Sequence, residues 1–184
     1  MLRAFILSVS LFTVILTAEV QRTEIGQRAY ISIVDEDIKF LARIDSGARI
    51  TSLHAMNIRL EGPKAFIYAK KPEKLLGVPF HKKEKNEEYK RNIGRMISFT
   101  TYDEKGKQKR LQARVLNIAK VRNAQGVEYR YVVRLGLKYK NIIKYKEVNL
   151  RDRSSMSYKL LIGRNWLDDD FVIKTDMDVE KITY

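Results

Sequence analysis

The sequence of 184 residues contains no cysteine, two histidines and three prolines. Without cysteine, disulfide bonds, thiol nucleophiles and thiolate zinc sites are excluded. His54 and His81 alone, with no His-Glu-x-x-His segment, leave too few of the usual ligands for a catalytic zinc. No Gly-x-x-x-x-Gly-Lys-Ser/Thr segment is present, so the sequence carries no phosphate-binding loop of the ATP-binding type. We therefore predict neither a metal site nor another cofactor.

The composition of the remaining chain is that of one folded domain. Hydrophobic residues make up 45% of the sequence, which is enough to form a core. With three prolines and nine glycines, no linker-like segment is visible. We assign the domain to residues 25–184 and expect it to be held together by its core alone.

The first residues differ from the rest of the chain. Met1-Leu2-Arg3 carries one positive charge, and residues 4–18 form an uncharged, mostly apolar run that ends before Glu19. This pattern is typical of a secretory signal peptide, and the run is shorter than the roughly 20 apolar residues of a spanning helix. We predict a signal peptide over residues 1–18, or an uncleaved N-terminal anchor. In both cases the protein is exported, periplasmic or secreted, and only this segment is expected to meet a membrane.

Basic residues outnumber acidic ones. The chain has 36 Lys and Arg against 22 Asp and Glu, a net charge of +14, and removal of residues 1–18 would leave about +13. Such an excess favours polyanionic partners such as acidic peptides, although a solvated basic surface is an equally open reading. Ten tyrosines could stack on nucleic-acid bases, but no recognised nucleic-acid motif is present, so nucleic acid is not the favoured partner.

Most of the domain is predicted to form β-strands. Short segments rich in β-branched and aromatic residues alternate with turns, which favours a closed or sandwich-like β-fold. One hairpin is expected over 52–60, an exposed charged loop over 81–91 and a brief helix over 165–169. The strands are predicted at 29–34, 38–44, 96–102, 111–121, 127–137, 142–150, 160–162 and 171–173.

The candidate catalytic segment is Asp45-Ser46-Gly47-Ala48, which follows an apolar strand. An aspartate on a tight turn can act as an acid-base group, Gly47 permits close backbone approach, and the Ser46 hydroxyl can donate to a carboxylate. An Asp-Ser-Gly turn also occurs in many β-proteins without any catalytic role. The tetrapeptide alone therefore leaves both interpretations open.

A second segment, Leu161-Ile162-Gly163-Arg164, strengthens the catalytic interpretation. Together the two segments resemble the retropepsin-like aspartic peptidases, in which Asp-Thr/Ser-Gly-Ala lies on one loop. In that family two hydrophobic residues and a glycine pass close behind the loop and lead into a short helix. With residues 51–55 and 152–158, the chain is also similar to the bacterial family labelled ATP-dependent zinc protease. Its members are viewed as retropepsin-like, and some trim poly-glutamate tails from a ribosomal protein.

The resemblance implies a mainly β, retropepsin-like closed barrel with one short C-terminal helix. Its function would be that of an aspartic endopeptidase, a hydrolase of peptides or proteins that are extended and acidic. The chain has one Asp-Ser-Gly motif, whereas the mechanism needs two carboxylates that share a proton. A homodimer with Asp45 from each subunit is thus implied. Ser46, Gly47 and Ala48 would support the active loop, with Leu161, Ile162, Gly163 and Arg164 behind it.

Two departures and one alternative accompany the resemblance. Arg49 and Asn165 stand where the viral pattern has an acidic or amide residue and an aspartate, which puts the viral type of dimer salt bridge in doubt. The hairpin at Arg122, Asn123 and Gly126 is the candidate flap over the substrate. The alternative is a non-catalytic exported β-module that binds acidic peptides or other polyanions, with Asp45 as an ordinary turn residue.

Four further features are expected to be structural. We predict that His54 is a hydrogen-bonded histidine in a turn and that Trp166 belongs to the core. Asp152 and Arg153 are expected to form a local ion pair. The acidic run at 168–170 is read as a hydrophilic helix end rather than a calcium site.

Overall fold

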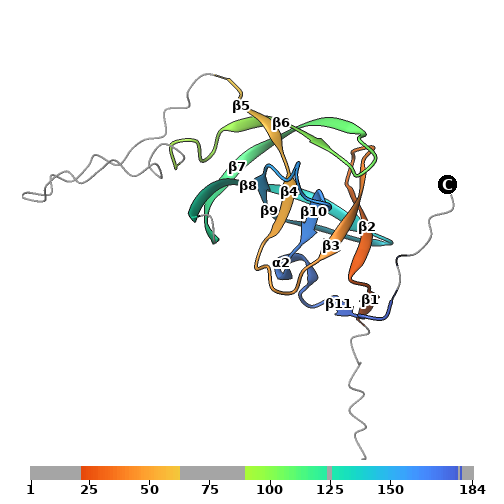
Figure 1. Ribbon diagram of the computed structural model, residues 1–184. Helices are drawn as coiled ribbons and strands as arrows, with labels where there is room; N and C mark the ends of the chain where they lie inside the picture. The colour runs from red at the N-terminus through yellow and green to blue at the C-terminus, as the bar shows by residue number, and fades with distance from the viewer. Residues whose placement is uncertain (1–21, 63–89, 124–125, 178, 180–184) are drawn as a thin grey trace, which may run out of the picture.

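The fold consists almost entirely of strands. The computed structural model describes residues 22–62, 90–123, 126–177 and 179, and the one labelled helix among them is short (Figure 1). The elements are β1 (Thr23–Ile25), β2 (Arg28–Ile33), β3 (Lys39–Ile44), β4 (Thr51–His54), β5 (Met56–Leu60), β6 (Met96–Tyr102), β7 (Gln108–Asn123), β8 (Gly126–Tyr139), β9 (Ile142–Arg151), β10 (Leu160–Ile162), α2 (Arg164–Leu167) and β11 (Phe171–Ile173).

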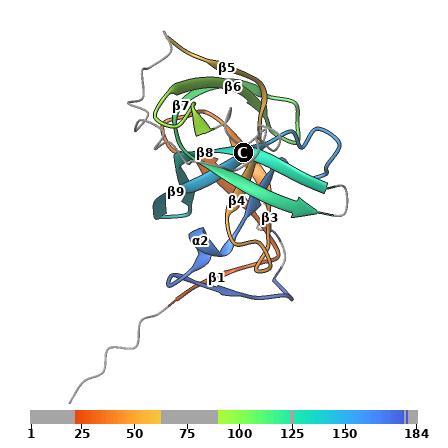
Figure 2. The ribbon, with the colours of Figure 1, turned by 90° about the vertical axis from the view of Figure 1, so that its left-hand side faces the viewer.

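Six strands close into a ring. The sheet order is β2-β3-β10-β4-β9-β8-β7-β6-β5, and β2 also pairs with β8, so that the first six return to their starting strand. The closing contact joins Ser32 to Lys138 and Ile33 to Leu137. β7, β6 and β5 continue from β8 as a curved extension (Figures 1 and 2). The predicted mainly β fold with a closed arrangement of strands and one short helix near the C-terminus is confirmed.

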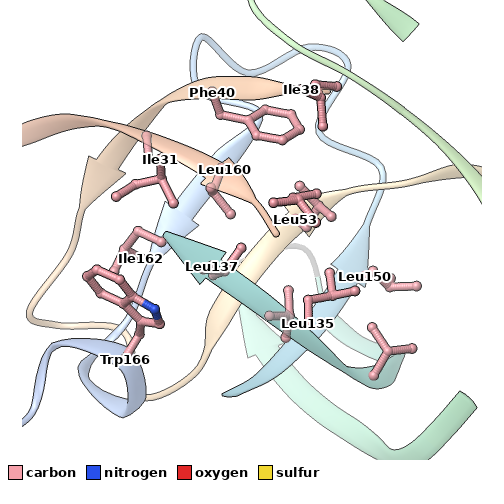
Figure 3. Packing of buried hydrophobic residues seen from close by; sticks show 14 of the residues in the cluster. Ile31, Ile38, Phe40, Leu53, Leu135, Leu137, Leu150, Leu160, Ile162 and Trp166 are labelled. Carbon is pink, nitrogen blue, oxygen red and sulfur yellow. The ribbon is translucent and has the colours of Figure 1, made fainter. Parts of the chain in front are cut away.

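The interior of the ring is filled by aliphatic and aromatic side chains. Ile31, Phe40, Leu53, Leu137 and Ile162 are each 0% exposed, and they point inward from five different strands (Figure 3). Full burial of such a side chain contributes about 1.5–3 kcal/mol. The same residues alternate with exposed or half-buried ones along β2 and β3, which is the pattern that a one-sided strand requires.

Trp166 anchors α2 to the core. Its side chain is fully buried, and its ring stacks on that of Phe171 at 4.6 Å between centroids. The prediction that Trp166 is a core residue is confirmed. The helix covers 164–167 rather than the predicted 165–169, because Asp169 already takes a positive φ of 76°. The acidic run that follows is exposed at Asp168 and Asp169, while Asp170 pairs with Lys144.

The predicted hairpin over residues 52–60 is wrong. β4 pairs with β10 and β9, whereas β5 pairs with β6. The chain leaves the ring at Ala55, whose N–H still donates to the carbonyl of Arg151. Both segments are β-rich, so their local pattern resembles two arms of a hairpin although their partners lie far away in the sequence. The short strand β1, which pairs with β11, was not predicted.

Two predictions concern residues outside the described part of the chain: the signal peptide at 1–18, and the charged loop up to residue 89, which includes His81. None of the helices in the described ranges is long and apolar enough to cross a membrane.

Candidate active site

Asp45 lies at the point where β3 ends and its loop begins. Its N–H donates to the carbonyl of Ile162 at 2.9 Å. Its carboxylate Oδ1 accepts from the N–H groups of Gly47 at 3.0 Å and Ala48 at 3.2 Å. The Asp45 side chain is half-buried, and Ser46 and Gly47 are exposed. The backbone thus holds one carboxylate oxygen, and no hydrogen bond from the Ser46 hydroxyl to Asp45 occurs in the described structure.

Gly163 brings the segment behind the loop into close contact. β10 runs parallel to the end of β3, with Ile162 opposite Ile44. A Cβ at Gly163 would lie 2.7 Å from the carbonyl carbon of Ile50 and 2.9 Å from the oxygen of Ala48. Only glycine fits without a backbone shift. The close passage of this segment behind the Asp45 loop, expected from the resemblance, is therefore present.

The loop is further tied to α2 by hydrogen bonds that the sequence alone did not predict. Asn165 Oδ1 accepts from both the N–H and the hydroxyl of Thr51, at 2.9 and 3.0 Å. Asn165 Nδ2 donates to the carbonyl of Glu147 at 2.7 Å, and Thr51 Oγ1 accepts from Gly163 N–H at 3.2 Å. Asn165 thus joins β4, β9 and α2 at the place where the viral pattern has an aspartate.

The side chain of Arg164 is exposed and forms no ion pair among the described residues.

A large groove, here called the basic groove, adjoins the loop. It has a volume of about 1110 Å³ and is lined by residues 48–50, by residues 117–122 of β7, by Arg130 and Val132 of β8, and by β9. Asp45 is not itself part of the lining, but its neighbours Ala48 and Arg49 are. One lining residue is acidic, Glu147, against seven basic ones: Arg49, Lys120, Arg122, Arg130, Lys146, Arg151 and Arg153. The groove therefore carries a strongly positive field, which favours anionic ligands.

The candidate flap is the end of the long β7–β8 hairpin. Asn123 pairs with Gly126 at its end, and the two arms extend beyond the ring of strands (Figure 2). Arg122 lines the same groove as Ala48 and Arg49. The hairpin and the end of the Asp45 loop thus line the same groove, and the role of the hairpin as a flap stays a prediction. Residues 124–125 are outside the described part.

The loop at 152–158 is organised around Lys159. Its ammonium donates to the carbonyls of Arg153, Ser154 and Met156 at 3.3, 2.9 and 2.6 Å. Such a ring of carbonyls satisfies a cation without an acidic partner. The loop therefore has a defined shape next to the basic groove.

His54 is buried beneath this loop. Its Nδ1 accepts from the N–H of Arg153 at 2.9 Å, and its ring packs edge-on against Tyr102 at 4.4 Å between centroids. Burial lowers the pKa of His54, Asp152 acts in the opposite direction, and Lys159 and Arg153 lower the pKa further. The predicted structural role is confirmed, but on β4 rather than in a turn.

The predicted ion pair between Asp152 and Arg153 is wrong. Asp152 accepts from the N–H of Ser154 at 2.9 Å and is 67% exposed. Arg153 is instead buried, and its Nε donates to the carbonyl of Tyr158 at 3.0 Å. Neighbours in sequence point to opposite sides of an extended chain, so adjacency did not imply contact. The buried arginines Arg130 and Arg153 were not predicted as site residues, because a single sequence gives no signal that a basic residue is buried.

A model of the RimB-like family, described as retropepsin-like aspartic endopeptidase RimB, matches residues 81–179. The match covers more than half of the chain, including β10 and α2. The chain belongs to the RimB-like family. The matched range begins after the Asp45 loop, so the position of Asp45 rests on the geometry above. The label of ATP-dependent zinc protease is not confirmed, and no group of three or more His, Asp or Glu suited to a metal occurs in the described residues.

This RimB-like chain has further, more distant similarities. It is 25% identical over 155 residues to a protein named probable alpha-L-glutamate ligase from Shewanella halifaxensis, and 26% identical to one of the same name from Shewanella pealeana. In each case 77% of this chain matches 28% of the relative, so the chain spans little more than a quarter of these relatives. A solved structure, protein Lpg0085 of unknown function from Legionella pneumophila, superposes with a TM-score of 0.62 at 20% identity, covering 87% of this chain and 98% of that one. This last similarity concerns the fold alone.

Proposed function

We propose that this RimB-like protein is an aspartic endopeptidase that works as a homodimer, with Asp45 from each subunit, on extended acidic peptides. The observation that carries the proposal is the Asp45 loop itself. One carboxylate oxygen is held by two backbone N–H groups, and the loop is pressed against Gly163 of the segment typical of retropepsins. Family membership supplies the reaction class.

The mechanism requires a second carboxylate. Aspartic peptidases use two carboxylates that share one proton, because two adjacent like charges do not both ionise. The chain has one Asp-Ser-Gly motif and thus offers one such carboxylate. A two-fold dimer brings Asp45 of the partner subunit to the same place. The ionised carboxylate then takes a proton from water, while the protonated one donates to the scissile carbonyl.

The preference for acidic substrates is supported by the basic groove, with its seven basic lining residues and one acidic residue. An extended peptide in this groove would meet the arms of β7 and β8, whose backbone can pair with a bound strand. A domain similar to this one also forms part of proteins named probable alpha-L-glutamate ligases, and that name fits glutamate-containing chains as ligands. The positive charge predicts that binding weakens as salt is raised.

The place of action follows from the first residues. The predicted signal or anchor at 1–18 would export the domain, and its substrates are then periplasmic or extracellular. Membrane contact beyond this segment is not part of the proposal. Nucleic acid is not proposed as a partner.

The test is cleavage of an acidic peptide library by residues 19–184, wild type beside Asp45→Asn, between pH 4 and 8. Cleavage by the wild type alone supports the proposal, because an amide keeps the two hydrogen bonds to Oδ1 but cannot act as the acid or base. Equal cleavage by both proteins would overturn the role of Asp45. If a folded dimer cleaves nothing but still binds the acidic peptides, the non-catalytic binding module is the better description.

A further inference from the structure

Two arginines that line the basic groove are almost completely buried, Arg130 with 8% and Arg153 with 7% of its surface exposed. A guanidinium is costly to bury unless its N–H groups find acceptors. The partners of each arginine therefore indicate whether it serves the fold or is kept for a ligand.

Arg130 has acceptors for both terminal nitrogens within the protein, although its buried Nε has no hydrogen-bond partner among the described residues. Its Nη2 donates to Glu128 Oε2 at 2.7 Å and its Nη1 to Asn149 Oδ1 at 3.1 Å. Arg151 Nε lies 3.3 Å from the same carboxylate oxygen of Glu128. Asn149 in turn donates to the carbonyl of Thr51 at 2.8 Å. Arg130 thus has a carboxylate of its own and belongs to the scaffold of the groove.

Arg153 has no such partner. Its Nε donates to the carbonyl of Tyr158 at 3.0 Å, which fixes the plane of the guanidinium. A guanidinium carries five N–H groups, four of them on the two terminal nitrogens. Within 22–62, 90–123, 126–177 and 179, neither terminal nitrogen of Arg153 has an acceptor or an ion-pair partner. Arg153 is therefore a buried, oriented cation whose terminal N–H groups have no partner among the described residues.

The position of Arg153 links it to the active loop. It lines the basic groove together with Ala48 and Leu161. Burial lowers the pKa of Arg153, as do Arg151 and Arg130, whereas nearby Asp45 raises it. An arginine nevertheless stays charged at neutral pH. Arg153 is thus surrounded by more positive than negative charge. It lies on the side of the groove that is near Asp45.

We propose that Arg153 binds a carboxylate side chain of the substrate next to the scissile bond, and so decides at which residue the peptide is cut. This inference rests on the proposed function and adds the residue that sets its specificity. A carboxylate accepts two parallel N–H bonds from a guanidinium. A glutamine at the same position of the peptide offers one acceptor and no charge, and leaves a buried donor unpaired. Hydrogen bonds to charged groups then predict a preference for glutamate of roughly 10- to 100-fold.

The experiment uses a set of acidic peptides in which each Glu in turn is replaced by Gln. The ratio of kcat/KM for the Glu and Gln peptides is measured for the wild type, Arg153→Gln and Arg153→Lys. Arg134→Gln is the matched control, since it removes the same charge from an exposed position of β8 that does not line the basic groove. We expect one peptide position with a preference of at least about tenfold in the wild type. The preference should vanish in Arg153→Gln, be reduced in Arg153→Lys and persist in Arg134→Gln.

Three outcomes would overturn the inference. The first is a folded Arg153→Gln protein, judged by its thermal melt, that keeps the wild-type preference. The second is a wild-type protein that shows no tenfold preference at any peptide position, a result that can be obtained even if neither variant folds. The third is a loss of activity in Arg153→Gln without a change in the ratio, which would assign Arg153 to the structure of the loop.

A binding measurement separates this inference from the proposed function. Fluorescence anisotropy of labelled Glu and Gln peptides is measured on Asp45→Asn, with and without Arg153→Gln. The wild type could fail to cleave while the tighter binding of the Glu peptide over the Gln peptide is lost in the variant with Arg153→Gln. The carboxylate site then stands and the peptidase assignment fails. If cleavage depends on Asp45 and neither readout depends on Arg153, the peptidase stands and the carboxylate site fails.

Discussion

The N–H of Asp45 and the carbonyl of Ile162 are joined by a hydrogen bond of 2.9 Å that crosses from the end of β3 to the end of β10. Next to it, Gly163 leaves room for the backbone between Ala48 and Thr51 to pass. The candidate catalytic carboxylate is therefore positioned by two short segments that lie more than a hundred residues apart in the sequence.

Subunit mixing tests whether two copies of Asp45 form one site. Asp45→Asn is added in increasing amounts to a fixed amount of wild-type protein. At equal amounts, activity should fall to about half, because half of the wild-type subunits are then paired with inactive ones. Activity that is constant at all ratios, while differently tagged subunits are shown to exchange, would mean that one chain is active alone.

Gly163→Ala should damage both stability and activity. The added Cβ would meet backbone atoms at 2.7–2.9 Å, and overpacking of this kind costs about 1–3 kcal/mol. Chemical denaturation measures the loss. The control is Gly106→Asn, at a turn with φ of +83° and nothing within 4 Å of the added carbon, since asparagine tolerates this conformation. Equal stability of the two variants would show that the contact at Gly163 is relaxed.

Asn165→Asp tests the hydrogen-bond network of Thr51. The carboxylate keeps the acceptor for Thr51 but loses the donor to the carbonyl of Glu147, which lies 2.7 Å from Nδ2. The carboxylate oxygen and the carbonyl of Glu147 are then two acceptors that face each other. We expect the free energy of unfolding to fall by about 1–3 kcal/mol at pH 7. Lowering the pH should restore part of it, because a protonated carboxyl can donate again. Thermal melts at pH 7 and pH 4.5, relative to wild type, give the comparison, and an unchanged melting temperature at pH 7 would contradict it.

The pH dependence of stability should carry a contribution from His54. Burial lowers the pKa of His54 below its ordinary value of 6.5, so the unfolded chain binds a proton at a higher pH than the folded protein. The contribution is fully present above the unfolded pKa and is lost as the pH falls through 6.5 toward the lower folded pKa. For one group, the free energy of unfolding changes by at most about 1.4 kcal/mol per pH unit.

His54→Asn is the matched variant for this slope, since its amide oxygen can replace Nδ1 as acceptor for Arg153. Free energies of unfolding between pH 7.5 and 5.5 should depend less on pH in the variant than in the wild type. Parallel curves would show that His54 titrates alike in both states. The absolute loss of stability in the variant does not bear on the test, because only the slopes are compared.

The sequence by itself determined much of the architecture. Partial alternation of apolar and polar residues along 38–44, β-branched composition and turn residues identify most strands, since these properties are local. Asp45 and the segment ending in Gly163 were identified from their residue types and from the family resemblance. The pairing of β4 with β9 and β10 was not predicted, because a local pattern does not name its partner.

Tertiary structure alone decided what surrounds the site. Asn165 meets Thr51 across 114 residues, and Arg153 contacts His54 and Tyr158 rather than the adjacent Asp152. From one sequence, a basic residue is predicted to be exposed to solvent, because charged residues usually are. Whether it is buried depends on which strands close over it. Closure of the ring buried Arg130 with a carboxylate and Arg153 without one, and that difference is a property of the folded chain.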